Sequence, residues 1–462
     1  MAQKWWVLAA VACGTFMATL DSSIVNIALP TLTKELNTSL YEVKWVIIIY
    51  LLVITCLLLP FGRISDQYGR KRIFQAAFII FTLGSAMCGL AEQMTWLLVF
   101  RAIQGIGAAM LMANGPAVIT AAFPAGERGK ALGTLAMVVS SGLILGPSIG
   151  GILISRLGWE SIFLVNIPVG IVGSFLVHRF VEGEKDPRPL ASFDWAGTIT
   201  QVIFILSLIL LMEPPLIAIA GSGFFPIPRW VLALFTAIFG ALFIKIESQT
   251  KYPVFDLSLL KNRTFWTAIL ASFLIFISYS SLAVLMPFFL EEVLHYSPEK
   301  AGLFMTAIPF TIFVIAPISG ILSDRFGSME LSIAGAAVGA IGLFIMAGIF
   351  GMGMHEEISR VGIILALCSI GLATGLFQSP NNNAIMGAVP ANKLGVASAL
   401  IATVRNLGMV TGTGLATAIF AWRIRLKYSF VDSLHFTFYV AGIISVGATI
   451  ASFGKKRGPM KS

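Results

Sequence analysis

The chain has 462 residues, of which 57% are hydrophobic and only 11% are charged, and its mean hydropathy is +0.90. This composition excludes a soluble globular domain, because too few polar residues are present to cover a water-exposed surface. The net charge of +9 does not indicate nucleic-acid binding, since the basic residues are spread over short loops. The composition therefore predicts an all-helical integral membrane protein in a lipid bilayer.

Hydrophobic runs of roughly 20 residues, the length that crosses a bilayer, recur along the whole chain. In chain order, fourteen spans are predicted at residues 5–29, 45–63, 72–91, 96–121, 131–155, 161–180, 194–213, 229–246, 264–290, 301–323, 331–350, 361–388, 395–422 and 433–454. The eighth span is the weakest, because it is short and follows an irregular loop. Lysine and arginine accumulate in cytoplasmic loops. If the N-terminus is placed on the cytoplasmic side, most lysines and arginines fall in cytoplasmic loops. Both termini are therefore predicted to be cytoplasmic.

The sequence consists of two related halves. The segment GRISDQYGRKR, which begins at Gly62, has a partial copy, GILSDRFGSME, which begins at Gly320, 258 residues later. Gly107 of the fourth span and Gly371 of the twelfth are 264 residues apart. The repeat predicts a six-helix bundle at 1–190, an insert of two helices and a linker at 191–262, and a second six-helix bundle at 263–462. Two such halves are typical of transporters that rock around a central site.

Five motifs carry a resemblance to a known family. In chain order they are LDSSIVNIALP (20–30), GRISDQYGRKR (62–72), LVFRAIQGIGAA (98–109), LGPSIGG (145–151) and WESIFLVNIPVG (159–170). Together they resemble the signatures of the major facilitator superfamily, and of its fourteen-span drug:proton antiporter subfamily. The resemblance implies the major facilitator fold, alternating access, and exchange of a small molecule for protons in the cytoplasmic membrane. We expect a monomer without cofactor or metal, since the cysteines and histidines form no ligand cluster.

The loop after the second span is predicted to act as a cytoplasmic latch. Its glycines allow close helix approach and a tight turn, and the resemblance implies that the loop holds the two halves together in one state. The latch residues are Gly62, Asp66, Gly69, Arg70 and Arg72, with Glu127 and Arg128 as partners. Alternatively, the loop only sets the topology, with surface ion pairs worth under about 1 kcal/mol each.

Asp21 is the only carboxylate predicted to lie within the membrane, where an ionised acid costs about 2.5 to 3.5 kcal/mol at a helix centre. Counting about 1.5 Å per residue from the ends of their spans places Asp21 and Arg101 in the same outer layer of the bilayer. If they meet, proton binding at Asp21 releases Arg101. The pair is therefore predicted to couple protons to transport; the alternative is a structural ion pair that sets helix packing.

The fifth-span segment LGPSIGG is similar to the motif associated with antiporters. Its small residues and proline let a helix bend or pack closely, at Gly146, Pro147, Gly150 and Gly151. The corresponding segment of the second half, GMVTGTGLAT from Gly408, has no proline. Only the first half is therefore predicted to have a proline hinge.

Polar side chains are sparse in the predicted spans and aromatic ones are common, as suits an amphiphilic substrate. The candidate cavity residues are Asn26, Gln104, Asn114, Phe276, Tyr279, Phe377, Gln378, Asn381, Asn382 and Arg405. Arg405 has either a substrate role or a packing role. The second half has no acid at the depth of Arg405, and the lack of such an acid argues against divalent organic cations as substrates. The sequence predicts proton-coupled efflux of amphiphilic compounds, with export of a dedicated endogenous lipid or metabolite as the alternative. No nucleophile or nucleotide-binding loop indicates an enzyme.

Overall fold

The structure of the protein is a computed structural model. It describes residues 3–124, 127–183, 194–212, 228–250, 259, 261–351, 356–389 and 394–454, and every element of regular secondary structure in these ranges is helical. The chain divides into two compact units, Met1–Phe255 and Asp256–Ser462. The two-helix insert falls within the first unit, and the predicted division into three parts stays a prediction.

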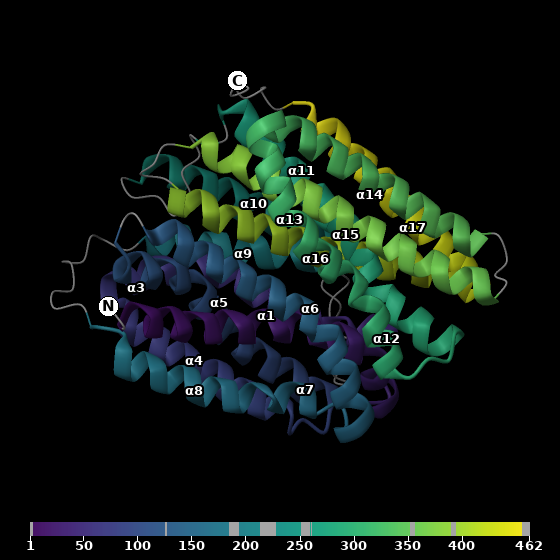
Figure 1. The fold of residues 1–462 in the computed structure, drawn as a ribbon, viewed down its shortest axis with the longest axis horizontal. Helices are drawn as coiled ribbons and strands as arrows, with labels where there is room; N and C mark the ends of the chain where they lie inside the picture. The colour runs from purple at the N-terminus through teal and green to yellow at the C-terminus, as the bar shows by residue number, and fades with distance from the viewer. Residues whose placement is uncertain are drawn as a thin grey trace. The chain divides into compact units, whose positions relative to one another are not determined.

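The first unit contains ten described helices (Figure 1). They are α1 (Gln3–Glu35), α2 (Leu40–Val43), α3 (Trp45–Tyr68), α4 (Arg70–Cys88), α5 (Met94–Ala122), α6 (Arg128–Leu157), α7 (Ser161–Leu164), α8 (Asn166–Phe180), α9 (Trp195–Met212) and α10 (Arg229–Gln249). Helix α1 lies against α5, α6 and α8, and α4 lies between α5 and α8. The insert helices α9 and α10 pack on each other, and α9 also contacts α3.

The second unit repeats this packing. Its elements are α11 (Arg263–Phe288), a π-helical turn (Phe289–Val293), α12 (Pro298–Met305), α13 (Ala307–Phe326), α14 (Ser328–Gly351), α15 (Glu356–Gly387), α16 (Leu394–Arg425) and α17 (Phe430–Ser452). Helix α11 lies against α15, α16 and α17, as α1 lies against α5, α6 and α8. Helix α14 lies between α15 and α17, as α4 lies between α5 and α8. The internal repeat predicted from the sequence is therefore present in the packing.

Thirteen helical segments in the described part of the chain are long and apolar enough to cross a membrane, judged by length and composition. Helix α9 adds a shorter apolar segment, Trp195–Leu211. Each predicted span coincides with one of these segments, although four of the segments combine two successive helical elements. Prolines lie inside seven of the long helices without ending them, as is common in membrane helices.

Local sequence signals explain several helix boundaries. Ser39 and Glu42 form a reciprocal capping box at the start of α2. The side chains of Asn262, Ser297 and Ser429 accept backbone N–H groups at the starts of α11, α12 and α17. Gly69 separates α3 from α4 with φ of 95°, a conformation that residues with a Cβ rarely adopt.

Candidate proton-coupling and substrate site

A buried network of polar side chains lies inside the first unit, where α1, α4, α5 and α8 meet. At its centre are Asp21 of α1, which is 0% exposed, and Arg101 of α5, which is 1% exposed. Gln104, also on α5, and Asn166, the first residue of α8, are buried beside them. The predicted meeting of Asp21 with Arg101 is therefore observed, and the pair is removed from solvent.

Both oxygens of the Asp21 carboxylate accept hydrogen bonds. Arg101 Nη1 donates to Oδ2 at 2.6 Å. Gln104 Nε2 donates to Oδ1 at 2.8 Å, and Asn166 Nδ2 donates to the same oxygen at 3.2 Å. A buried carboxylate needs such partners, since an unpaired charge in a dry interior costs several kcal/mol or more.

The Arg101 guanidinium is held on several sides. Its Nε donates to the Val46 carbonyl oxygen at 3.0 Å, and its Nη1 also donates to Gln104 Oε1 at 2.7 Å. Its Cζ lies 4.0 Å from the centre of the Tyr50 ring and 5.6 Å from that of Phe163. Aromatic faces attract a cation, most strongly where water is excluded. Arg101 therefore has other partners when Asp21 is neutral.

A second shell of contacts orients the amides of the network. Ser85 Oγ of α4 accepts from Gln104 Nε2 and from Asn166 Nδ2, each at 3.0 Å, and donates to the Phe163 carbonyl oxygen at 2.8 Å. Gly84 allows this approach, because a Cβ added to it would lie 2.7 Å from the Gln104 backbone nitrogen. Ser85 was not predicted from the sequence, where nothing marks it, whereas Asn166 lies inside the sixth-span motif.

Protonation and ion pairing compete at Asp21. A protonated carboxyl no longer balances the Arg101 charge, and a charged carboxylate in this dry environment requires it. A proton bound at Asp21 therefore changes the forces between α1 and α5.

The antiporter-like motif packs α6 directly against the segment of α1 that carries Asp21. A Cβ added to Gly146 would lie 2.5 Å from Ser23 Oγ, and one added to Gly150 would lie 2.6 Å from Ile24 Cγ1. Ser23 Oγ donates to the Leu143 carbonyl oxygen across the same contact, at 3.0 Å. Pro147 lies inside a continuous helix. The motif thus forms a close contact beside the network, and its hinge role stays a prediction.

The predicted latch residues lie at the end of the first unit where α1 and α4 begin. Arg70 Nη1 donates to the Ala117 carbonyl oxygen of α5 at 3.5 Å, and Arg72 is exposed. Glu127 forms an ion pair with Lys4 of α1, a partner that was not predicted. A Cβ at Gly62 would meet no atom within 4 Å. The side chains of Asp66 and Arg128 lie outside the described part, and the latch stays a prediction.

Asp21 is not the only buried acid in the described helices, but burial in the protein does not measure depth in the bilayer, and the prediction that Asp21 is the only intramembrane carboxylate stays a prediction. Asp194, Glu247 and Glu291 are also buried, with exposed fractions of 9%, 4% and 8%. All three lie at helix ends. Asp194 precedes α9 and its Oδ1 accepts a hydrogen bond from the Gly197 backbone N–H at 2.7 Å, whereas Glu247 lies at the carboxyl end of α10 and Glu291 in the π-helical turn that follows α11. Hydropathy places such residues poorly because it gives span boundaries only approximately.

Three predicted cavity residues of the first unit bond within the bundle. Gln104 belongs to the buried network and not to an open cavity. Asn26 Nδ2 donates to the Ser22 carbonyl oxygen of its own helix at 3.1 Å. Asn114 Nδ2 likewise donates to the Met110 carbonyl oxygen at 2.7 Å, while its buried Oδ1 has no partner among the described residues.

The aromatic candidates of the second unit fill contacts between helices. Phe377 is buried in a core cluster of α11, α14, α15 and α17. Phe276 lies under Gly408, where a Cβ would be 2.8 Å from Phe276 Cβ. The Tyr279 hydroxyl lies in the same way against Gly339. These positions support packing for all three residues, and substrate contact stays a prediction.

The polar candidates of the second unit are less completely paired. Asn381 Nδ2 donates to the Ala268 carbonyl oxygen at 3.1 Å, but its buried Oδ1 has no partner in the described ranges. Gln378, Asn382 and Arg405 are half-buried. No ion pair or hydrogen bond joins Arg405 to any other residue that the structure describes. Arg405 is thus a half-buried cation in the middle of α16, and its substrate role stays a prediction.

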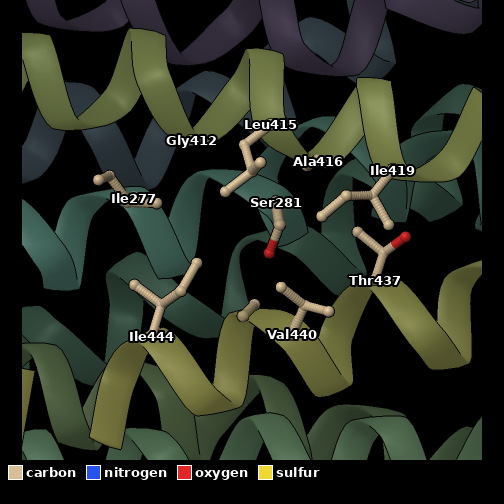
Figure 2. A pocket seen from close by; sticks show the side chains of 10 residues that line it. Ile277, Ser281, Gly412, Leu415, Ala416, Ile419, Thr437, Val440 and Ile444 are labelled. Atoms are coloured by element: carbon tan, nitrogen blue, oxygen red, sulfur yellow. The ribbon is translucent and has the colours of Figure 1, made fainter. Parts of the chain in front are cut away.

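A small cavity lies between α11, α16 and α17, lined by Ile277, Ser281, Gly412, Leu415, Ala416, Ile419, Thr437, Val440, Ala441 and Ile444 (Figure 2). Its volume is about 10 Å³, room for one water at most. The hydroxyls of Ser281 and Thr437 donate to carbonyl oxygens of their own helices. This cavity cannot hold a substrate. No group of three or more His, Cys, Asp or Glu among the described residues is placed to hold a metal ion.

Solved structures with the same fold include two transporters. The POT family transporter PepTSo matches with a TM-score of 0.72 and 13% identity, covering 98% of this chain and 97% of that one. The xylose transporter XylE from E. coli, in an inward open conformation, matches with a TM-score of 0.66 and 16% identity, covering 99% and 98%. At these identities the likeness shows the fold.

Relatives in sequence include a transporter and two resistance proteins. Riboflavin transporter RibZ of Clostridioides difficile is 35% identical over 93% of this chain and 91% of its own length. Multidrug resistance protein Stp of Mycobacterium tuberculosis is 31% identical over 90% and 76%. Methyl viologen resistance protein SmvA of Salmonella typhimurium is 30% identical over 93% and 84%.

The repeated bundles and the many apolar helices are those of a multi-pass membrane protein, and the relatives and structural neighbours named as transporters define a transporter of small molecules and not an enzyme. The sequence model of the Major Facilitator Superfamily matches residues 11–413, and the chain belongs to that family.

Proposed function

We propose that this protein is a proton-coupled antiporter that exports amphiphilic small molecules across the cytoplasmic membrane by alternating access. The observation that carries the proposal is the buried pair of Asp21 and Arg101, joined at 2.6 Å at the meeting point of four helices. Intramembrane ion pairs of this kind are costly to bury and mark ion or proton pathways. The antiporter-like glycine motif packs against the same stretch of α1.

In the proposed cycle, Asp21 is charged and paired with Arg101 while the proton site is empty. Proton binding neutralises Asp21 and leaves Arg101 with Gln104, the Val46 carbonyl and the Tyr50 ring. The free-energy difference between these two arrangements shifts the balance between the outward-facing and inward-facing states. The antiporter-like motif of α6 and the latch of the α3–α4 loop are proposed to respond to that shift.

The basic residues of the first unit support the proposed orientation. Lys4, Arg70, Lys71, Arg72 and Arg179 gather at the end of the unit where α1 and α4 begin and α8 ends. Lysine and arginine favour the cytoplasmic side. We therefore assign this end, and both termini of the chain, to the cytoplasm, with the protein acting as a monomer in the bilayer.

The proposed substrates are neutral or anionic amphiphiles. The multidrug relatives support a broad range of substrates, and Arg405, which has no described acidic partner, favours a substrate with an anionic or electron-rich group. The same charge disfavours dications such as methyl viologen, although the relative SmvA is named for resistance to that compound. A dedicated metabolite is the second candidate, and the 35% identity with a riboflavin transporter favours it.

Transport into everted membrane vesicles tests this proposal. Fluorescent lipophilic compounds, riboflavin and methyl viologen are each assayed with and without an imposed pH gradient. The wild type is compared with Asp21→Asn and with the control Glu92→Gln, which alters an exposed loop acid. We expect gradient-driven uptake of neutral or anionic amphiphiles by the wild type and by the control, and loss of it in Asp21→Asn.

Two results would redirect the proposal. Gradient-driven transport that persists in Asp21→Asn contradicts proton coupling at that residue. Transport of riboflavin alone, with no uptake of the lipophilic compounds, replaces multidrug efflux with the dedicated-metabolite function.

A further inference from the structure

An open groove runs along the outer face of the first unit between α4 and α8, which lie side by side in Figure 1. The two helices are antiparallel and in fixed register. Lys71 Nζ donates to the His178 carbonyl oxygen at 2.9 Å, and Gln75 Nε2 donates to Ser174 Oγ at 2.5 Å. At the far end Gly170 lies directly over Thr82, so that α8 can approach α4 closely.

The groove has a volume of about 480 Å³ and mostly apolar walls. Its walls include Ile79, Leu83, Ile171 and Phe175, whose exposed fractions range from 48% to 62%. Gly170, Ser174 and Thr82 are the small residues of its lining, beside the side chains of Gln75 and Phe78. This surface is long, narrow and apolar, and it therefore suits a hydrocarbon chain.

The floor of the groove also contains unused polar atoms. Gln75 Oε1 and Thr82 Oγ1 are buried and have no hydrogen-bond partner among the described residues. Pure lipid tails leave such atoms unsatisfied, at a cost of about 1 to 3 kcal/mol each by protein mutational data. The Thr82 hydroxyl can donate to an ester oxygen of a lipid, whereas Gln75 Oε1, which only accepts, requires a hydroxyl donor such as those of a phosphatidylglycerol headgroup.

The length of the groove matches one leaflet of a bilayer. From Lys71 to Leu83 the rise of α4 is about 18 Å at about 1.5 Å per residue. The hydrocarbon core of one leaflet is about 15 Å thick, half of a core of about 30 Å. An acyl chain that enters at the Lys71 end therefore reaches the middle of the membrane at Leu83.

Positive charge gathers at the Lys71 end alone. Lys71 and Arg72 begin α4, and His178 and Arg179 end α8, with Arg72, His178 and Arg179 exposed. The nearby acid, Glu182, accepts a hydrogen bond from Gln3 at 3.0 Å. With Lys4 and Arg70 at the same end of the unit, five permanent positive charges thus lie there with two acids among the described side chains, Glu182 and the Lys4 partner Glu127. Basic pockets between membrane helices at this depth suit anionic headgroups.

We propose that this groove is a binding site for an anionic phospholipid. Lys71 and Arg179 hold the phosphate, the oxygens of Gln75 and Thr82 face the glycerol region, and one acyl chain lies on Ile79, Leu83, Ile171 and Phe175. A second copy of the chain fits the groove less well. In a two-fold dimer through this face, the basic end of one copy would contact either the basic end or the apolar walls of the other. The site is independent of the transported substrate.

Binding at this groove also acts on the buried network. Ser85 of α4 and Asn166 of α8 both belong to the hydrogen bonds around Asp21. A lipid that contacts both helices holds those two residues together, and a ligand that binds only the folded form raises its stability. We therefore expect the lipid to raise the melting temperature of the protein.

Native mass spectrometry of the full chain in detergent tests the site. The protein is titrated with phosphatidylglycerol, with phosphatidylcholine and with glycerol phosphate. The variants are Lys71→Gln/Arg179→Gln, which removes the charges, and Ile171→Trp, which fills the groove. Val172→Trp is the matched control, because Val172 is 52% exposed on α8 but does not line the groove.

We expect phosphatidylglycerol to bind the wild type and raise its melting temperature, and glycerol phosphate not to compete with it. The charge variant should bind phosphatidylglycerol about tenfold more weakly and phosphatidylcholine unchanged. Ile171→Trp should lose both lipids, and Val172→Trp should behave as the wild type. Equal binding of phosphatidylglycerol by the charge variant, competition by glycerol phosphate, or dimers that Ile171→Trp dissociates would each overturn the proposal.

Discussion

The two bundles share one packing scheme but differ in the chemistry of their innermost contact. In each, a glycine-bearing helix packs on the first helix of the bundle: Gly146 of α6 against α1, and Gly412 of α16 against α11. The facing segment of α1 is TLDSSI, which contains Asp21, whereas that of α11 is FLIFI. Equivalent backbone positions thus carry a charge in one bundle and only apolar side chains in the other.

The contrast continues on the neighbouring helix. The offset of 264 residues that relates Gly107 to Gly371 places Leu365 and Cys368 where the first bundle has Arg101 and Gln104. The second bundle instead has Arg405, with no described acidic partner, on α16. The difference teaches that the repeat supplies a scaffold, while the proposed proton site belongs to one half and a cation without a described acidic partner to the other.

The largest expected effect separates the two arginines. Arg101→Gln leaves the Asp21 charge buried without its partner, which costs about 3 to 5 kcal/mol. Arg405→Gln breaks no described ion pair, and we expect a change in the free energy of unfolding of under about 1 kcal/mol. Thermal or denaturant unfolding in detergent measures both. Equal losses for the two variants would contradict the contrast between the bundles.

A smaller loss is expected for Gln104→Leu. The leucine removes the Gln104 donor to Asp21 Oδ1 and the acceptor for Arg101, at a cost of about 1 to 3 kcal/mol. The matched variant in the second bundle, Cys368→Leu, changes no described hydrogen bond and should cost less. The free energies of unfolding of the two variants give the comparison, and a greater loss at Cys368 would count against it.

The glycine contacts should differ in tolerance. A Cβ at Gly412 would lie 2.3 Å from the Ile277 carbonyl oxygen and within 3 Å of two more backbone atoms, whereas the two atoms nearest a Cβ at Gly146 are Oγ and Cβ of Ser23, of which Oγ can rotate away. We expect Gly412→Ala to destabilise the protein by about 1 to 3 kcal/mol, the usual cost of overpacking, and Gly146→Ala by less. The melting temperatures of the two variants measure which substitution destabilises more. A lower melting temperature for Gly146→Ala than for Gly412→Ala would contradict the prediction.

The smallest effect concerns the ion pair between Glu127 and Lys4. Both side chains are partly exposed, 46% and 19%, so Glu127→Gln should cost under about 1 kcal/mol, less still at high salt. Unfolding at low and high salt measures it. If Glu127 also serves the proposed latch, Glu127→Gln should lower the transport rate with little change in the free energy of unfolding. A large loss of unfolding free energy would indicate a structural role for Glu127 instead.

Much of the fold was predictable because the hydrophobic runs and the internal repeat can be read directly from the order of residues in the sequence. Every span coincides with an apolar helix, and the close approach of Asp21 to Arg101 follows from counting residues along two helices. Ser85 was missed because a single serine in an apolar run carries no signal, and its role arises only when α4 packs against α5 and α8. Phe377, predicted for the cavity, lies in the core because composition does not tell which face of a helix is inside.

The central claim is that the proton acts in the first bundle and the substrate's charge is recognised in the second. Reconstituted vesicles allow two assays on the same variants: uptake driven by a pH gradient, and exchange of labelled for unlabelled substrate without a gradient. We predict that Asp21→Asn loses the first and keeps the second, while Arg405→Gln loses both for an anionic substrate. Loss of exchange in Asp21→Asn, or full gradient-driven uptake by it, would contradict the claim.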